Sequence, residues 1–349
     1  MKIIKYEIKR GDTLESIAEK HQITIKMLLD FHNSHSSVTQ QFYGDRLPVH
    51  IDTIMMPAKK EHLEKNIDDE AFEQKVRYRC EQLNITRIEE DVKSYSQLKK
   101  EYQVAYNLGN HLMHVELCDF FYELNPPALS RIFDFISQID YIRNNCLVEI
   151  NQLGRFSKII NKDKLRASWE EFKNNKLNDL EFIKVIKQTK PNEYSKLITE
   201  GDFQFSNEYD DEKDYNRDLF YLTVLDKYLY YNNDNLQEEQ YIYQSQLFPD
   251  VTVPMTVRYD ILNEKDGHVT IRKVWETIES EELLEKISKG YEKYHQPLIK
   301  YKFSKYKLDM RNLFTYNLKT KVLEKAELSI IENIENNIKS ECIFNLRKI

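Results

Sequence analysis

Glycine is scarce in this sequence, with only 7 among 349 residues. None of them forms Gly-x-Gly-x-x-Gly or Gly-x4-Gly-Lys-Ser/Thr, the loops in which backbone amides surround a phosphate. The sequence also lacks the Gly-x-Ser-x-Gly elbow of α/β-hydrolases and the His-Glu-x-x-His pair of zinc proteases. These absences argue against a nucleotide-binding protein and against both kinds of hydrolase.

Long apolar runs and paired cysteines are absent as well. No segment approaches the roughly 20 apolar residues that cross a bilayer, and the first residues show no apolar stretch of signal-peptide length. The 4 cysteines are far apart and form no Cys-x-x-Cys pair, so we expect reduced, packed thiols. The sequence therefore predicts a cytoplasmic protein, or one that a dedicated secretion machine carries out of the cell.

An excess of positive charge is missing too. The formal net charge is −7, which provides no basic surface for nucleic acid, and we do not expect a nucleic-acid partner. At 349 residues the chain is long enough to bury two or three hydrophobic cores.

The first 58 residues carry the most informative pattern. Residues 3–8 alternate between apolar and charged side chains, which predicts a short strand. Gly11 and Asp12 predict a turn, and Asp12 or Thr13 can cap a helix that places Leu14, Ile17 and Ala18 on one face. A second helix follows from Thr24, and a second strand runs into Pro57.

This spacing resembles a LysM domain, a small β-α-α-β module that binds N-acetylglucosamine in cell-wall glycans. The resemblance covers residues 1–58 and implies that sugar lies between the loop at residues 11–14 and the loop that follows the second helix. That second loop is long here, from His32 to Val49, and the usual Gly-Gln-x-Leu-x-Ile-Pro ending is missing. The aromatic rings of this loop could stack on a sugar. Alternatively, the loop could close the glycan groove or bind a protein. If the groove binds glycan, the resemblance implies these contacts: Gly11, Asp12, Thr13, Leu14, Phe42 and Tyr43.

The remaining chain predicts an α+β fold. The middle region, residues 70–245, shows strand patterns at 74–86, 102–122 and 146–160 and helical patterns at 128–142, around Trp169 and over most of 177–235. The last region, residues 250–349, predicts a hairpin at 256–275 around Asp266-Gly267, a helix at 281–295 and strands at 300–316, 322–333 and 338–349. The charged alternation of the last strands indicates an antiparallel sheet with one wet face, packed against helices. The two regions form either two domains or one.

Residues 146–172 and 257–287 share one order of elements. Each reads as strand, glycine turn, strand, tryptophan-containing stretch and helix. This order is compatible with an internal duplication and equally with a common β-β-α arrangement.

Candidate catalytic and metal-binding residues are few. His114, Glu116 and Cys118 alternate along a predicted strand and could share a face, whereas His111 would point away. A polar strand edge explains the same pattern. We therefore assign no catalytic residue, no metal site and no cofactor, and we expect a non-enzymatic protein.

Tyrosine is abundant, with 23 residues. A large apolar ring with a hydroxyl suits a protein-binding surface, and the densest stretch suggests Tyr228, Tyr230, Tyr231 and Tyr241 for that role. A composition rich in Tyr, Asn, Lys and Ile explains the abundance equally well.

Three classes of function follow. The chain resembles unexported LysM proteins of contractile injection machines, including type VI secretion systems, which implies a cytoplasmic adaptor that holds an effector or a spike component. The alternatives are a peptidoglycan-binding protein delivered to the cell wall, and a cell-wall hydrolase with an unrecognised site.

Overall fold

The computed structural model describes residues 3–9, 12–21, 25–36, 42, 47, 51–57, 72–229 and 236–349. Its contacts divide the chain into two compact units, Met1–Ile67 and Asp68–Ile349, which are described separately. The fold is α+β, as the sequence predicts.

The first unit has the predicted β-α-α-β order. It consists of β1 (Ile3–Glu7), α1 (Leu14–Lys20), α2 (Ile25–His35) and β2 (Thr53–Pro57). β1 and β2 pair antiparallel, with Tyr6 opposite Ile54. The core between the strands and the helices is apolar and consists of Leu14, Ile17, Ala18, Leu28, Phe42, Ile51, Ile54 and Met56.

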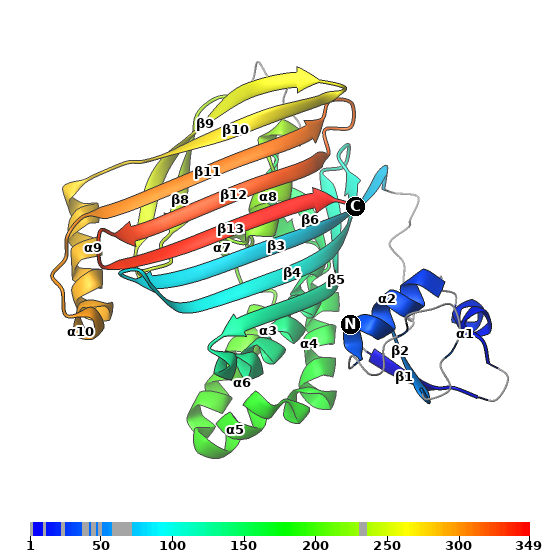
Figure 1. Ribbon diagram of the computed structural model, residues 1–349. Helices are drawn as coiled ribbons and strands as arrows, with labels where there is room; N and C mark the ends of the chain where they lie inside the picture. Colours follow the sequence, from blue (N-terminus) through cyan, green and yellow to red (C-terminus); the bar gives the residue numbers. More distant parts are fainter. Residues whose placement is uncertain are drawn as a thin grey trace. The chain divides into compact units, whose positions relative to one another are not determined.

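The second unit is built on one large antiparallel sheet (Figure 1). Among the described residues, eleven strands pair in the order β7-β6-β5-β4-β3-β13-β12-β11-β10-β9-β8. The strands are β3 (Gln74–Ile88), β4 (Asp91–Asn107), β5 (Leu112–Asn125), β6 (Asn145–Ile150), β7 (Phe156–Ile159), β8 (Glu239–Gln244), β9 (Thr252–Lys265), β10 (His268–Thr277), β11 (Tyr306–Asn317), β12 (Leu323–Ile334) and β13 (Ile338–Lys348).

Helices connect these strands. They are α3 (Ser130–Arg143), α4 (Lys162–Asn175), α5 (Glu181–Thr189), α6 (Pro191–Gln204), α7 (Glu212–Tyr215), α8 (Leu219–Val224), α9 (Glu281–Tyr294) and α10 (Gln296–Ile299). In Figure 1, α7 and α8 lie behind the sheet, and α9 and α10 lie at one end of it. Phe220 of α8 stacks on Tyr102 of β4 with ring centroids 3.8 Å apart, so this helix packs directly on the sheet.

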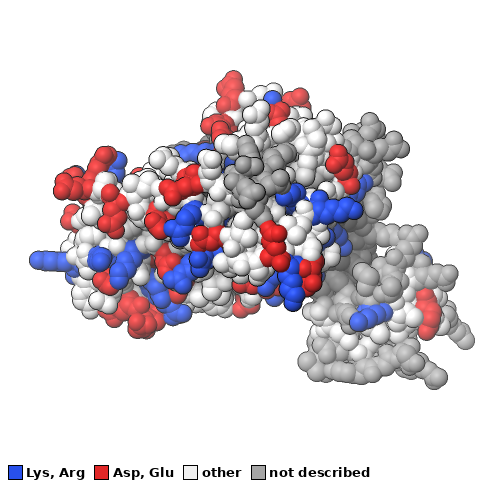
Figure 2. All heavy atoms as spheres, turned by 90° about the horizontal axis from the view of Figure 1, so that it is seen from above, with Lys and Arg blue, Asp and Glu red and all other residues white. Residues whose placement is uncertain are grey.

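The sheet has an inner face toward the helices and an outer face toward solvent. On β12 the inner side chains are buried, from Ala326 through Leu328 and Ile330 to Ile334, whereas Lys325 and Glu327 are exposed. The outer face carries cross-strand ion pairs such as Arg79–Glu101 and Arg87–Glu341. On the side of the molecule seen in Figure 2, basic and acidic side chains intermix over the second unit.

The structure corrects one expectation for this unit. The pattern at 102–122 is two strands, because the chain turns at residues 108–111 between β4 and β5. The sequence leaves open whether residues 70–245 and 250–349 form one domain or two. Both lie in one compact unit, in which β8 pairs with β9 and β13 pairs with β3 within one sheet.

The two segments with a shared order of elements lie on opposite sides of the central strands. β6, β7 and α4 form one set, and β9, β10 and α9 form the other. β7 is an edge strand, whereas β10 lies between β9 and β11. Both the duplication and the common β-β-α arrangement remain open. None of the helices among the described residues is long and apolar enough to span a bilayer.

Candidate functional site

The loop between β1 and α1 is closed by Asp12. One carboxylate oxygen, Oδ2, accepts hydrogen bonds from the Tyr6 hydroxyl at 2.9 Å and from the Lys9 backbone N–H at 2.7 Å. These hydrogen bonds, that from Lys9 above all, lower the pKa of the Asp12 carboxyl. Asp12 therefore shapes the loop, and its charge persists throughout the neutral range.

Thr13 caps α1. Its hydroxyl accepts a hydrogen bond from the Ser16 N–H at 3.1 Å, and the Ser16 hydroxyl accepts one from the Thr13 N–H at 2.9 Å. This reciprocal pair satisfies backbone donors at the start of the helix. Thr13 is exposed, but Leu14 is buried in the core of the unit and cannot offer its side chain to a ligand.

Phe42 does not lie on the surface. Its side chain is 4 % exposed and packs on the ring of His32 at 4.3 Å. Asn33 fixes its backbone, since the side-chain amide donates to the Phe42 carbonyl at 2.8 Å and accepts from its N–H at 2.7 Å. The expectation that Phe42 stacks on a sugar is therefore wrong, because this ring completes the core of the unit.

His32 does not belong to the long loop, contrary to the expectation from the sequence. α2 continues to His35, so His32 is helical, and it is buried. Its Nδ1 accepts the Met55 N–H at 3.0 Å and thereby joins α2 to β2. Gly11 and Tyr43, the other two predicted glycan contacts, lie outside the described residues.

The order β1-α1-α2-β2 and the Asp12–Thr13 loop indicate a known module. Residues 6–31 match the LysM domain model. The matched part of the LysM domain ends inside α2, before the long loop that holds Phe42. LysM domains are glycan-binding modules, so the match supports glycan binding by this unit.

Comparisons over the whole chain add little. A search of curated proteins found no match. A solved structure titled "Lipid-protein interactions in lipovitellin" aligns with 79 % of this chain at 10 % sequence identity and a TM-score of 0.36. The chain spans 25 % of that lipovitellin chain. A likeness at this level supports no inference about fold or ligand.

Two of the four tyrosines proposed as a protein-binding surface, Tyr228 and Tyr241, lie among the described residues. Tyr228 is fully buried, with its ring 4.8 Å from that of Tyr316. Tyr241 is half-buried, and its hydroxyl donates to the Asn216 carbonyl at 3.1 Å. Tyr230 and Tyr231 lie outside the described residues. The surface role is therefore wrong for Tyr228, because its ring is buried against Tyr316 of β11.

The histidine and cysteine candidates do not converge. His114 and Glu116 lie opposite Ala105 and Gln103 of β4, whereas Cys118 has no opposite residue because the register shifts there between Glu101 and Tyr102. Within the described ranges, no three His, Cys, Asp or Glu side chains could hold a metal ion. Burial raises the pKa of the Cys146 thiol to about 11 and that of Cys342 to about 12, which suits packed thiols rather than nucleophiles.

A buried charged cluster in the second unit was not predicted. Lys273 of β10 and Asp226 form an ion pair with both side chains 1 % exposed. Burial lowers the pKa of the Lys273 ammonium. Burial alone would raise the pKa of Asp226. The charges of Lys273 and Arg155 and the hydrogen bonds to the carboxylate together outweigh burial, so this pKa lies below its usual value.

Other members of the charged cluster come from distant elements. Arg155, in the β6–β7 loop, lies 4.0 Å from Asp226 and forms an ion pair with Glu239 of β8. The Tyr259 hydroxyl donates to Glu239 at 2.6 Å. A sequence signal was present, because Lys273 occupies the inward register of an alternating strand whose other inward residues are Val269, Ile271 and Trp275.

Proposed function

We propose that this protein is a non-enzymatic binding protein whose LysM unit binds N-acetylglucosamine-containing glycan of peptidoglycan. The observation that carries the proposal is the LysM match at residues 6–31. Asp12 and Thr13 support it, because hydrogen bonds to Lys9 and Ser16 hold these two residues in place while Thr13 stays exposed. Residues that are already held in place lose little conformational freedom when a ligand binds.

Co-sedimentation of the full chain with purified peptidoglycan tests this proposal. We expect the wild-type protein to sediment and a soluble β-1,4-linked N-acetylglucosamine oligomer to compete. Thr13→Ala should weaken binding several-fold, because the cap that holds the loop is lost, whereas Thr13→Ser retains the hydroxyl and should bind nearly as well. Tyr43→Ala tests the remaining aromatic contact directly.

Lys26→Ala is the matched control, since Lys26 is an exposed residue of α2 in the same unit. It should leave sedimentation unchanged. Wild-type protein that stays in the supernatant, or that sediments regardless of the competing oligomer, would overturn glycan binding.

The second candidate is a cytoplasmic adaptor for an effector or spike component of a type VI or related contractile secretion system. Its support is the resemblance to unexported LysM proteins and the large second unit that follows the LysM unit in the sequence. Purification of the tagged protein from its native host should recover a spike, tube or toxin protein in near-equal amount. Recovery of muropeptides alone would favour the glycan proposal.

A further inference from the structure

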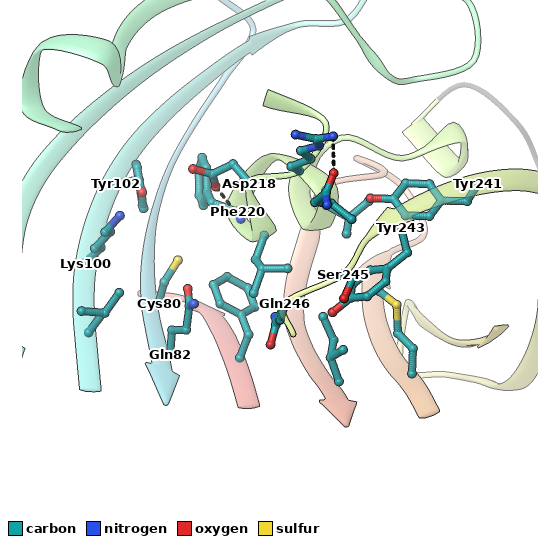
Figure 3. Close-up of a pocket in the computed structure, with 18 residues that line it drawn as sticks. Cys80, Gln82, Lys100, Tyr102, Asp218, Phe220, Tyr241, Tyr243, Ser245 and Gln246 are labelled. Atoms are coloured by element: carbon teal, nitrogen blue, oxygen red, sulfur yellow. Dashed lines mark hydrogen bonds between the residues drawn. The ribbon is translucent and has the colours of Figure 1, made fainter. Parts of the chain in front are cut away.

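The second unit contains a cavity of about 420 Å³ between the sheet and α8 (Figure 3). Cys80, Gln82, Lys100 and Tyr102 line it from β3 and β4, and Tyr241, Tyr243, Ser245 and Gln246 line it from β8 and the segment that follows. Asp218 and Phe220 lie between these two groups. Cavities of about 300–1,000 Å³ hold small organic ligands, and this volume lies near the lower end.

Part of the cavity wall is apolar. Leu98, Met310, Ile330 and Phe344 contribute side chains from the inner face of the sheet, and Leu222 contributes one from α8. Such walls stabilise an apolar ligand by removing its surface from water.

The charged groups at the cavity do not balance. Lys100 pairs with Asp140 at 2.6 Å, and Asp218 pairs with Arg143 at 3.4 Å. Arg217 has no carboxylate within 4.0 Å among the residues that the structure describes. Its Nη2 donates to the Gln244 side-chain oxygen at 2.7 Å, so further guanidinium N–H groups remain for a ligand.

Glu332 carries one more carboxyl group close to the cavity, next to the lining residues Ser245 and Gln246. It accepts hydrogen bonds from the Ser245 hydroxyl at 2.5 Å, the Gln246 N–H at 2.7 Å and the Tyr306 hydroxyl at 3.0 Å. These donors occupy the Glu332 oxygens, so it does not serve as a partner for Arg217.

We propose that this cavity binds an apolar molecule that carries a single carboxylate, with Arg217 pairing the carboxylate and the apolar walls enclosing the rest. An arginine fork matches the two oxygens of a carboxylate. A single unpaired guanidinium fits a monoanion better than a phosphate, which carries more charge. The site is separate from the LysM unit, and the proposal does not depend on glycan binding.

The same ligand chemistry has two sources, a free organic acid and the carboxyl terminus of a polypeptide. Isothermal titration of the full chain distinguishes them. The free-acid probes are octanoate and 4-phenylbutyrate, each compared with its neutral amide. The polypeptide probe is a peptide ending in Leu-Phe with a free carboxylate, compared with the same peptide amidated. We expect either the two free acids or the peptide with a free carboxylate to bind. The matching amides should bind at least about tenfold more weakly.

Substitutions then assign the binding to the cavity. Arg217→Gln should reduce affinity for the acid at least about tenfold and leave the amide nearly unchanged. Arg311→Gln, on the exposed outer face of β11, is the matched control and should bind like the wild type. Arg217→Lys keeps the charge and should retain part of the affinity. Leu98→Trp fills the cavity and should abolish binding of acid and amide alike.

Fluorescence of Trp169 and Trp275, both in the second unit, monitors folding of each variant. Three results would overturn the proposal. The acid and its amide could bind equally well, Arg217→Gln and Arg311→Gln could lose the same affinity for the acid, or neither set of probes could bind. If Arg217→Gln does not fold, Arg217→Lys and Leu98→Trp decide the outcome.

Discussion

At the scale of single residues, buried polar groups determine how the second unit responds to its surroundings. Glu332 is fully buried on the inner face of β12 and anchors the segment after β8 by accepting hydrogen bonds from Ser245 and Gln246. Burial raises the pKa of the Glu332 carboxyl above its usual 4.5, although these hydrogen bonds oppose the rise.

This raised pKa predicts a pH-dependent contribution to stability. The folded state keeps a proton that the unfolded state has already released, so the contribution is complete below pH 4.5 and is lost as pH rises through the folded pKa. Relative to the wild type, Glu332→Gln should therefore gain stability as pH rises from 4.5, by at most about 1.4 kcal/mol per pH unit. Urea unfolding monitored by tryptophan fluorescence at several pH values measures this difference.

Glu327→Gln is the control for that experiment, because Glu327 lies on the same strand with an exposed side chain. Its difference from the wild type should not follow the trend of Glu332→Gln. A difference between Glu332→Gln and wild type that is constant from pH 4.5 to pH 8 would contradict the prediction.

At the scale of elements, close packing constrains the helices. Gly201 lies in α6 directly against Trp169 of α4, and a Cβ at Gly201 would be 2.4 Å from Trp169 Cζ2. The Trp169 Nε1–H donates to Asp202 at 2.7 Å, which fixes the ring beside this glycine.

Gly201→Ala should therefore destabilise the second unit. Alanine favours a helix over glycine by about 1 kcal/mol, but displacing a packed indole costs typically about 1–3 kcal/mol. Urea unfolding by tryptophan fluorescence should show a net loss. Ser195→Ala, at an exposed position of the same helix, should change stability by less than about 0.5 kcal/mol. Equal stability of Gly201→Ala and wild type would show that the indole moves freely.

Elements with a strong local signal could be predicted from the sequence. The Asp266-Gly267 turn identified the β9–β10 hairpin, and Ser280 caps α9 by accepting the Leu283 N–H at 3.1 Å. The β3–β4 hairpin was only partly predicted. It turns at Glu89 and Glu90 without glycine, and charged side chains on the outer face weaken its apolar pattern.

The site was less predictable than the elements. The Asp12–Thr13 loop depends on contacts between neighbours in the sequence, so the pattern located it. Phe42 was misplaced because its burial depends on His32 and Asn33 across the unit. The cavity around Arg217 is lined by residues of β3, β4, β8 and α8. These elements are far apart in the sequence, so no local sequence pattern can predict that they form one cavity.

At the scale of the whole second unit, the buried charged cluster connects the two edges of the sheet. Arg155 follows β6 near one edge, Glu239 belongs to β8 at the other edge, and Asp226 and Lys273 lie between them. Charges buried this deeply stabilise a fold only while they are paired.

Lys273→Met should accordingly cost about 3–5 kcal/mol, because the buried charge of Asp226 loses the closer of its two cations, Lys273, and keeps only Arg155 at 4.0 Å. Asp226→Asn combined with Lys273→Met should cost much less than the sum of the single changes. A double-mutant cycle from urea unfolding measures this coupling. Strictly additive effects would mean that the pair does not act as a unit. Lys325→Met, on the exposed face of β12, is the control and should be nearly neutral.

The position of β13 has a consequence for how the protein is made. β13 follows the other ten described strands of its sheet in the sequence, yet it lies between β12 and β3 and pairs with both. While a ribosome is still producing β12, the strands already made form two separate half-sheets, each with an open edge. Only β13 joins them, so the sheet cannot close before β13 has been made. Until then the open edges can pair with other chains, and a chaperone that covers exposed strand edges would protect the protein at this stage.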